Sequence, residues 1–420
     1  MTTQRELAIE IVTALRQAGH QALFAGGCVR DLLLEKTPKD YDVATSANPE
    51  EVQKLFGHRR TLAVGASFGV VMVLPLRKKG EPHATDEQAA IPPVEVATFR
   101  KDGLYVDGRH PETVTFSTPE EDAKRRDFTI NGMFFDPLTE VVHDYVGGRA
   151  DLEQRQLRAI GVAADRFRED KLRLLRAIRF NSILGFNIEP ATWQAVMELA
   201  PEITAVSRER IAAELRRMLA HPSRHRSVQS LDESGLTQAI FENAVSSCSP
   251  ATLSALKALQ TDSFETGMAV WLKDLPKPKL GQLCTHLKLS NQERDAILWL
   301  ADQQTVWIDF GDWPIARQKR LLAHPLVHEL VATGEALAAA GSIAAEHLAV
   351  ARKRLKVWSP AEINPPLIVT GENLIQWGLR PGPGFRDLLE SLRDQQLEGQ
   401  LSSMEDARHW LVRAGHLTQP

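Results

Sequence analysis

Apolar residues in the first third of the chain change between the spacing of strands and the spacing of helices. Short apolar runs predict strands over residues 21–25, 41–44, 69–74, 94–99 and 113–116. Between them the pattern predicts helices over residues 28–34 and 49–56, and another helix that starts near Thr118, which can cap it, with Pro119 in its first turn. Residues 1–150 therefore predict a small unit of mixed strands and helices.

From about residue 152 onward, strand signals nearly vanish and apolar residues recur at helical spacing. Leu172, Leu175 and Ile178 are one example of such a buried stripe. Breaks that contain proline, at residues 249–250, 276–278, 359–366 and 381–383, indicate joints between helical subdomains. The pattern as a whole favours an α+β fold with a mixed sheet at the start and helices after it.

Composition limits the class of protein. With 420 residues, of which 43% are hydrophobic and 25% charged, the chain has an ordinary globular composition and room for two to four units. Its three cysteines are far apart and odd in number, so neither a disulfide framework nor a Cys-rich zinc site is indicated, and a reducing cytoplasm fits best. No apolar run is long enough to cross a bilayer, so we expect a soluble protein with no membrane partner.

Positive charge is concentrated in the middle third, although the net charge is −4. Solvated helix faces with ion pairs account for about half of these residues, and the rest are available to line a basic groove for a polyanion. The basic residues are Lys124, Arg125, Arg126, Arg166, Arg168, Lys171, Arg173, Arg176, Arg179, Arg208, Arg210, Arg216, Arg217, Arg224 and Arg226.

Two aspartates follow a glycine pair at a short distance in the sequence. Side chains in a strand alternate faces, so Asp40 and Asp42 are expected on one face, where they can share a pair of divalent cations. Gly26 and Gly27 open the helix at 28–34, where free N–H groups can meet a phosphate. Glu95, acidic within an apolar strand, is a candidate third ligand. An aspartate pair or a glycine pair alone is more often a turn or a packing feature, and for Glu95 an exposed strand glutamate is about as frequent as a ligand. Together these features indicate phosphoryl or nucleotidyl transfer.

Residues 125–133 place charges and an amide around apolar residues. We expect Asp127 to hold Arg126 while that guanidinium meets a ribose or a phosphate, with Asn131 on the same face as Asp127 if the segment is helical. The alternative is a surface ion pair with an incidental asparagine. The later stretch 144–152, which contains a glycine pair, predicts a flexible link between the sheet unit and the helices.

Asp170 and Arg173 lie three residues apart and would face the same way on a helix. One interpretation is an ordinary helix salt bridge. The other is base recognition, because a carboxylate accepts from the exocyclic amine of cytosine or adenine and a guanidinium donates to the adjacent ring nitrogen, whereas guanine and uracil reverse this pattern. Arg210 and Glu214 are spaced as a surface helix pair, and Arg208 is a candidate for contact with a triphosphate or primer.

These segments, in this order, resemble the class II tRNA nucleotidyltransferases of the DNA polymerase β superfamily, which include CCA-adding enzymes and bacterial poly(A) polymerases. The resemblance is close over residues 20–220, through the runs Gly-Gly-x-x-Arg-Asp, Asp-x-Asp, Arg-Arg-Asp-Phe-Thr-Ile-Asn, Glu-Asp-x-x-Arg and Ser-Arg-Glu-Arg. A looser match at residues 370–383 looks like the helical region that holds tRNA in this family.

The resemblance implies a nucleotidyltransferase head (1–150), a helical neck that recognises the base (151–225), a helical body (226–358) and a tail that binds tRNA (359–420). It implies that Asp40 and Asp42 are catalytic and bind two Mg²⁺ ions, and that CTP and ATP are added to the tRNA 3′ end. The residues implied to bind nucleotide are Gly26, Gly27, Arg30, Arg126, Asp127, Asn131, Asp170, Arg173 and Arg176, and those implied to bind RNA are Arg208 and Arg210.

Several alternatives stay open at the level of sequence. Bacterial poly(A) polymerases typically carry a basic stretch where this chain has residues 65–70, which favours tRNA as the substrate. Residues 100–124 are long enough for the flexible loop that CC-only enzymes lack, but addition of A alone is not excluded. The polar stretch 77–93, a predicted hairpin excursion, has no functional interpretation. A non-catalytic RNA-binding protein is opposed by the presence of both aspartates, and the oligomeric state is undetermined.

Overall fold

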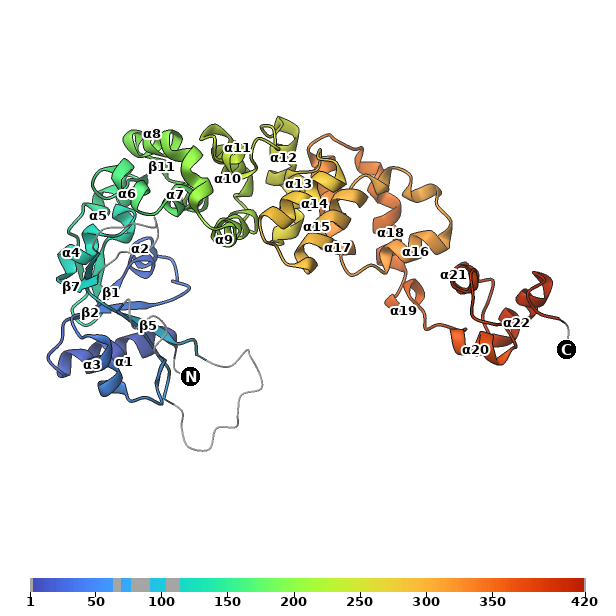
Figure 1. The fold of residues 1–420 in the computed structure, drawn as a ribbon, viewed down its shortest axis with the longest axis horizontal. Helices are drawn as coiled ribbons and strands as arrows, with labels where there is room; N and C mark the ends of the chain where they lie inside the picture. Colours follow the sequence, from blue (N-terminus) through green and yellow to red (C-terminus); the bar gives the residue numbers. More distant parts are fainter. Residues whose placement is uncertain (1–2, 63–68, 77–90, 103–113, 419–420) are drawn as a thin grey trace. The chain divides into compact units, whose positions relative to one another are not determined.

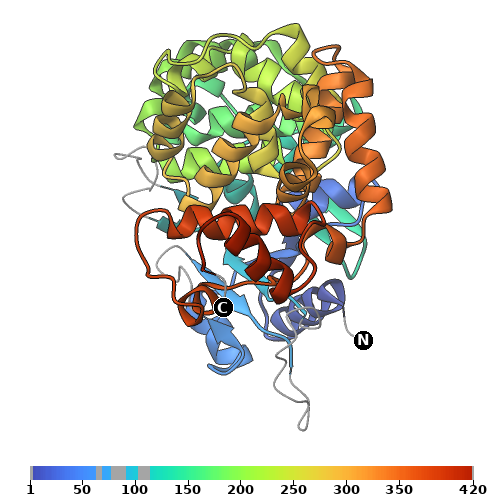
Figure 2. The same ribbon diagram turned by 90° about the vertical axis from the view of Figure 1, so that its right-hand side faces the viewer.

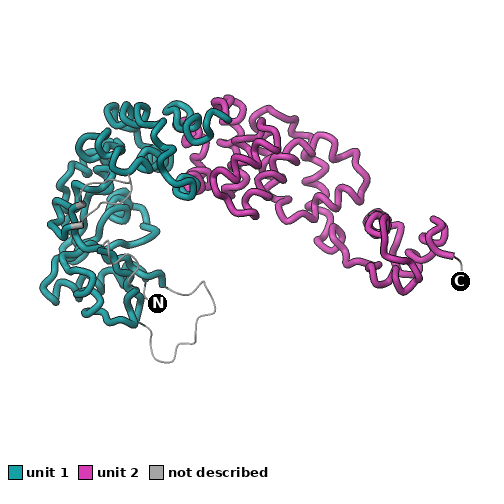
Figure 3. Tube along the Cα trace, in the orientation of Figure 1, with its two compact units in different colours: residues 1–214, 230–244 teal, residues 215–229, 245–420 magenta. Residues whose placement is uncertain are grey.

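The computed structural model describes residues 3–62, 69–76, 91–102 and 114–418. The predictions for residues 65–68, for the stretch 77–90 and for the loop at 103–113 lie outside this part of the chain. The protein divides into two compact units (Figure 3): unit 1 comprises residues 1–214 and 230–244, and unit 2 comprises residues 215–229 and 245–420.

Unit 1 contains a seven-stranded mixed sheet with the strand order β3-β4-β5-β2-β1-β8-β9 (Figure 1). The neighbouring strands β2 and β5 are parallel, and the other neighbours are antiparallel. The strands are β1 (Ala22–Ala25), β2 (Asp42–Thr45), β3 (Thr61–Leu62), β4 (Val70–Val73), β5 (Val94–Thr98), β8 (Phe134–Asp136) and β9 (Val141–His143), and a separate pair is formed by β6 (Arg100–Asp102) and β7 (Val114–Phe116).

The predicted mixed sheet is confirmed, but three of its strands, β3, β8 and β9, were not predicted. They have only two or three residues each, too few for a periodic signal. Helix α1 (Gln4–Gln17) buries Leu7, Ile11 and Leu15 and packs on β1, β2 and β5. The other helices beside the sheet are α2 (Gly27–Leu33), α3 (Pro49–Phe56) and α4 (Pro119–Lys124).

The rest of the described chain is mostly helical, as predicted, apart from the two-residue strands β10 (Gln156–Leu157) and β11 (Asn187–Ile188). Helices α5 (Gly148–Glu153), α6 (Ala163–Glu169), α7 (Leu172–Leu184), α8 (Pro190–Leu199) and α11 (Leu236–Ile240) belong to unit 1, and α9 (Arg208–Leu219) and α10 (Arg224–Glu233) have residues in both units.

Unit 2 contains the remaining helices, which in Figures 1 and 2 run from yellow to red. Buried residues of one core include Leu300, Trp307 and Leu330, and a separate core near the C-terminus includes Leu374, Leu392 and Leu411. The helices are α12 (Pro250–Ala258), α13 (Phe264–Trp271), α14 (Lys277–His286), α15 (Asn291–Gln303), α16 (Ile315–Leu322), α17 (Val327–Ala339), α18 (Ala349–Val357), α19 (Pro360–Ile363), α20 (Gly371–Gln376), α21 (Phe385–Leu397) and α22 (Met404–Arg413). No helix in the described part of the chain is long and apolar enough to cross a membrane.

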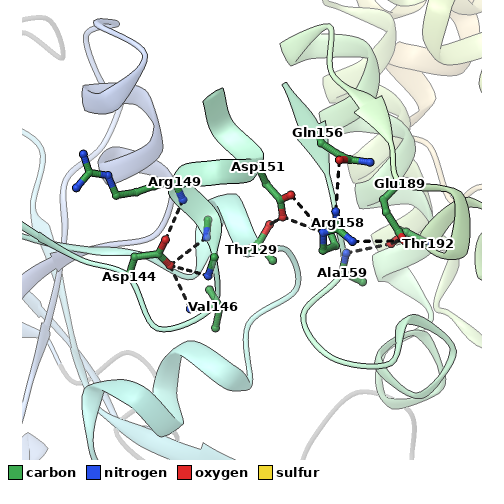
Figure 4. A network of polar contacts seen from close by, with 12 residues as sticks. Thr129, Asp144, Val146, Arg149, Asp151, Gln156, Arg158, Ala159, Glu189 and Thr192 are labelled. Atoms are coloured by element: carbon green, nitrogen blue, oxygen red, sulfur yellow. Dashed lines mark hydrogen bonds and ion pairs between the residues drawn. The ribbon is translucent and has the colours of Figure 1, made fainter. Parts of the chain in front are cut away.

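The turn before α5 connects the sheet to the helices (Figure 4). The Asp144 carboxylate accepts hydrogen bonds from four successive backbone N–H groups, those of residues 146–149, at 2.9–3.1 Å. A Cβ atom on Gly148 would lie 2.3 Å from the carbonyl oxygen of Thr129. Gly148 therefore serves close packing, and the contacts do not support the flexible link expected from the glycine pair.

Candidate active site

The sheet register brings two acidic side chains together. Asp42 is the first residue of β2 and is paired with Glu95 on the parallel strand β5. Residues that are paired on neighbouring strands point to the same face, so both carboxylates are on one side of the sheet. Asp40, by contrast, is exposed and lies two residues before β2 begins, so the prediction that both aspartates lie in the strand is wrong for Asp40.

Glu95 and Asp40 are close enough to affect the ionisation of Asp42. Burial first, and then the charges of Glu95 and Asp40, raise the pKa of Asp42 from 3.8 to about 6, against the opposing charge of Arg126. Burial also raises the pKa of Glu95. The start of these two central strands therefore carries negative charge that a cation would stabilise.

The glycine turn begins where β1 ends. Gly26 has a φ of 74° and caps α2, and its backbone N–H donates to the carbonyl oxygen of Met133. A Cβ atom on Gly26 would lie 2.9 Å from Nη1 of Arg126, and one on Gly27 would lie 3.7 Å from Nη2 of Arg30. The absence of a side chain at Gly26 thus lets the backbone approach the Arg126 guanidinium, whereas a Cβ on Gly27 would make only an ordinary van der Waals contact with Arg30.

Arg126 is held by a residue that the sequence analysis missed. Its Nε and Nη2 atoms donate to the carboxylate of Asp122, at 3.1 and 2.9 Å, and the guanidinium lies 5.0 Å from the ring centroid of Phe134. The prediction that Asp127 holds Arg126 is therefore wrong. The usable signal was the spacing of four residues between Asp122 and Arg126, which fits one face of α4 and the turn after it.

Asp127 instead joins the sheet region to α7. Its Oδ1 atom accepts from Nδ2 of Asn131 at 3.2 Å, and its Oδ2 atom accepts from Nε of Arg176 at 2.8 Å. Burial alone would raise the pKa of Asp127, but the charge and hydrogen bonds of Arg176 lower it to about 2. Asn131 in turn accepts from Nη1 of Arg30 at 2.8 Å, so four of the expected nucleotide-binding residues form one network, although residues 129–131 form a 3-10 turn and not an α-helix.

Asp170 and Arg173 are neighbours but do not form the predicted pair on a shared helix. Asp170 has an extended conformation before α7 begins, where its Oδ1 atom accepts from the backbone N–H of Leu172 at 3.0 Å. The Arg173 guanidinium donates to Glu169 at 2.8 Å and to the carbonyl oxygens of Arg166 and Arg125, at 3.0 and 3.1 Å. Both side chains are thus fixed separately, by neighbours that the sequence spacing did not indicate.

The two candidate RNA-binding arginines have acidic partners in unit 1. Nη2 of Arg210 lies 2.8 Å from Oδ2 of Asp170, and Nη2 of Arg208 lies 3.1 Å from Oε1 of Glu242. Glu214, expected to pair with Arg210, forms a buried ion pair with Arg179 at 3.0 Å. The segment of Arg208 and Arg210 therefore supports the Asp170 carboxylate directly.

Comparison with known proteins identifies the family. A family model described as the poly A polymerase head domain matches residues 22–158, and one described as a probable RNA and SrmB-binding site of polymerase A matches residues 185–247. The CCA-adding enzyme of Streptococcus pneumoniae is 31% identical over 98% of this chain and 98% of its own length. The chain belongs to the CCA-adding enzyme family.

Other members of the CCA-adding enzyme family agree with this assignment. The enzyme of Lacticaseibacillus paracasei is 34% identical over 94% of this chain and 92% of its own length. The solved structure of the Bacillus stearothermophilus CCA-adding enzyme in complex with CTP matches with a TM-score of 0.70 and 28% identity, covering 99% of this chain and 98% of that chain. The family and the fold class predicted from the sequence are confirmed.

Nucleotidyltransferases of the CCA-adding enzyme family generally use divalent metal ions. Within the described residues, no three His, Cys, Asp or Glu side chains are grouped so that they could hold a metal ion by themselves. Mg²⁺ is usually held by only one or two carboxylates together with substrate phosphates. The oxygen donors of Asp42 and Glu95, with their mutual repulsion, fit that requirement.

The Asp127–Arg176 pair leads to a prediction about stability. Replacing Arg176 with Met leaves a buried carboxylate without its cation, so we expect the free energy of unfolding to fall by about 3 kcal/mol at pH 7. Because the pKa of Asp127 is about 2 in the folded protein and 3.8 ordinarily, the stabilisation by the pair is complete above about pH 4 and is lost as the pH falls toward 2.

Urea titrations at pH 7 and at lower pH measure both effects. The control is the double variant Asp127→Asn with Arg176→Met, which removes the stranded charge and is expected to lose less stability than Arg176→Met alone. Equal losses in the single and the double variant would contradict this account of the pair.

Proposed function

We propose that this chain adds CMP and AMP, from CTP and ATP, to the 3′ end of tRNA without a nucleic-acid template and with release of pyrophosphate. The observation that carries the proposal is the carboxylate pair of Asp42 and Glu95, in a chain whose similarity to CCA-adding enzymes extends over nearly its whole length. The relative crystallised with CTP supports the nucleotide assignment.

The chemistry requires an attacking hydroxyl and a bound triphosphate. Asp40 and Asp42, with Glu95 as a third ligand, would hold two Mg²⁺ ions, which when bound neutralise the triphosphate and favour the ionised primer hydroxyl. The tRNA 3′ hydroxyl attacks the α-phosphorus, the bond to the bridging oxygen breaks, and pyrophosphate leaves. Gly26 and Gly27 leave room for the triphosphate beside Arg126, which Asp122 holds.

Base choice is assigned to Asp170 and Arg173. A carboxylate that accepts from an exocyclic amine and a guanidinium that donates to a ring nitrogen fit cytosine and adenine and reject guanine and uracil. The contacts of Arg173 with Glu169 and two backbone carbonyls, and those of Asp170 with Leu172 and Arg210, fix both side chains before a nucleotide binds.

The arrangement along the chain is proposed to follow the family. The head spans residues 1–150, the neck 151–225, the body 226–358 and the tail 359–420, and the separate core near the C-terminus supports a distinct tail. Arg30, Asp127, Asn131 and Arg176 are assigned to the nucleotide sugar and phosphates, while Arg208 and Arg210 are assigned to the primer side of the site. A cytoplasmic location is part of the same proposal.

Addition of A alone, or of a poly(A) tract, is the second candidate. The match of residues 22–158 to the poly A polymerase head domain fits these products as well as it fits CCA addition. The acceptor RNA does distinguish them, because each activity requires a different primer end.

The test supplies the protein with tRNA lacking its terminal CCA, tRNA ending in CC, and an oligo(A) primer, each with CTP, ATP or both. Three added nucleotides on the first tRNA with both triphosphates support CCA addition. Extension of only the CC-ended tRNA identifies an A-adding enzyme, and long products on oligo(A) identify a poly(A) polymerase. No extension of any primer would overturn the proposed function.

Asp42→Asn is expected to reduce nucleotide incorporation at least about a thousandfold, because it removes a charged ligand from the reacting centre. Binding of tRNA, measured by gel shift, should stay as in the wild type. Asp274→Asn is the matched control, since Asp274 is an exposed surface residue in unit 2. Normal incorporation by Asp42→Asn would exclude Asp42 as a metal ligand.

Asp170→Asn is expected to relax base choice. The amide keeps an oxygen to accept from Leu172 N–H but presents N–H donors where the carboxylate only accepted, so use of UTP and GTP should rise relative to CTP and ATP by about tenfold or more. Incorporation of each triphosphate, measured separately as kcat/KM, tests this. Unchanged selectivity would refute base recognition by Asp170.

A further inference from the structure

Phe180, on helix α7, is surrounded by three guanidinium groups. The guanidinium carbons of Arg30, Arg176 and Arg179 lie 5.3, 5.3 and 4.5 Å from the centroid of its ring. Arg30 comes from α2, beside the glycine turn, whereas the other two arginines come from α7 itself. These distances are within the range of cation–π attraction, in which the negative face of the ring attracts the cation.

Three like charges around one ring repel each other unless something offsets them. Each of the three guanidinium groups has one carboxylate partner, and the ring supplies the contact that they have in common. The ion pairs are Arg30 with Asp31 at 2.7 Å, Arg176 with Asp127 at 2.5 Å, and Arg179 with Glu214 at 3.0 Å.

The contacts link Phe180 and four polar residues into one ring of neighbours. Arg30 donates to Asn131, Asn131 donates to Asp127, and Arg176 donates to Asp127 from the opposite side. The ring of Phe180 then lies against both Arg30 and Arg176. The ring of Phe128 packs against it in a T-shaped arrangement, with the two ring centroids 5.8 Å apart.

We propose that Phe180 is a positioning residue for nucleotide binding. Its aromatic face holds the guanidinium groups of Arg30 and Arg176, and through them sets the orientation of Asn131 and Asp127 toward the sugar and phosphates of the incoming nucleotide. The inference rests on the proposed function in that the bound molecule is a nucleoside triphosphate. An aliphatic side chain of similar size fills the same space but has no negative face, so the arginines lose their shared contact.

The experiment compares Phe180→Leu, which removes the ring, with Phe180→Tyr, which keeps it. The readouts are the dissociation constants of CTP and ATP by equilibrium dialysis, KM and kcat on tRNA, and the urea unfolding midpoint. Phe186→Leu is the matched control, because Phe186 is buried just after α7 and no guanidinium contact with its ring is found within the described residues.

For Phe180→Leu we expect the dissociation constants and KM to rise about tenfold, the combined effect of two weakened cation–π contacts, with a smaller change in kcat. Phe180→Tyr should stay within about twofold of the wild type, because the ring face is retained. Phe186→Leu should lower only the unfolding midpoint.

The proposal is overturned if Phe180→Leu binds both triphosphates like the wild type, if Phe180→Tyr is as defective as Phe180→Leu, or if Phe186→Leu shows the same rise in KM. It is also overturned if the folded wild-type protein binds neither triphosphate. If CTP and ATP bind but no primer is extended, the proposed function fails, and the ratio of dissociation constants still decides the role of Phe180.

Discussion

The buried carboxylate of Asp127 connects the two parts of the site in unit 1, the residues beside the sheet and those on helix α7. Asp127 follows the helix that carries Asp122, accepts a hydrogen bond from Asn131, and forms an ion pair with Arg176 on α7. A charge taken out of water is tolerated only when such partners surround it, so its position is strongly determined. The Asp127 carboxylate thereby fixes residues beside the sheet and residues on α7 in position relative to one another.

The two sides of the site are electrostatically unlike. Burial, together with the charges of Glu95 and Asp40, raises the pKa of Asp42 to about 6, whereas the arginines of the site have carboxylate partners already. The proposed metal-bound triphosphate would bring positive charge to the carboxylates and would meet guanidinium groups that are already oriented, which would lower the ordering that binding requires.

The sequence predicted the parts of the site that depend on local pattern. The glycine turn, the strand with Asp42 and the helical character after residue 152 follow from short-range periodicity and are found as expected. The predictions were wrong where the sequence offers several possible partners and only tertiary contacts determine which one is used. Arg126 has Asp127 next to it and Asp122 four residues before it, and in the fold it pairs with Asp122. Phe180 gave no signal because a phenylalanine in an amphipathic helix normally indicates only core packing.

The position of Asp170 has a consequence for how tightly a nucleotide is held. Each of its two oxygens already accepts a hydrogen bond, one from the N–H of Leu172 and the other from Arg210, so under the proposed base recognition an incoming base would share an acceptor that is already in use. The base would then gain less than from an unused acceptor, which would keep the complex weak enough to dissociate. For a polymerase that must accept two different bases in turn, a carboxylate whose hydrogen bonds are already satisfied inside the protein would favour release of the nucleotide over tight binding.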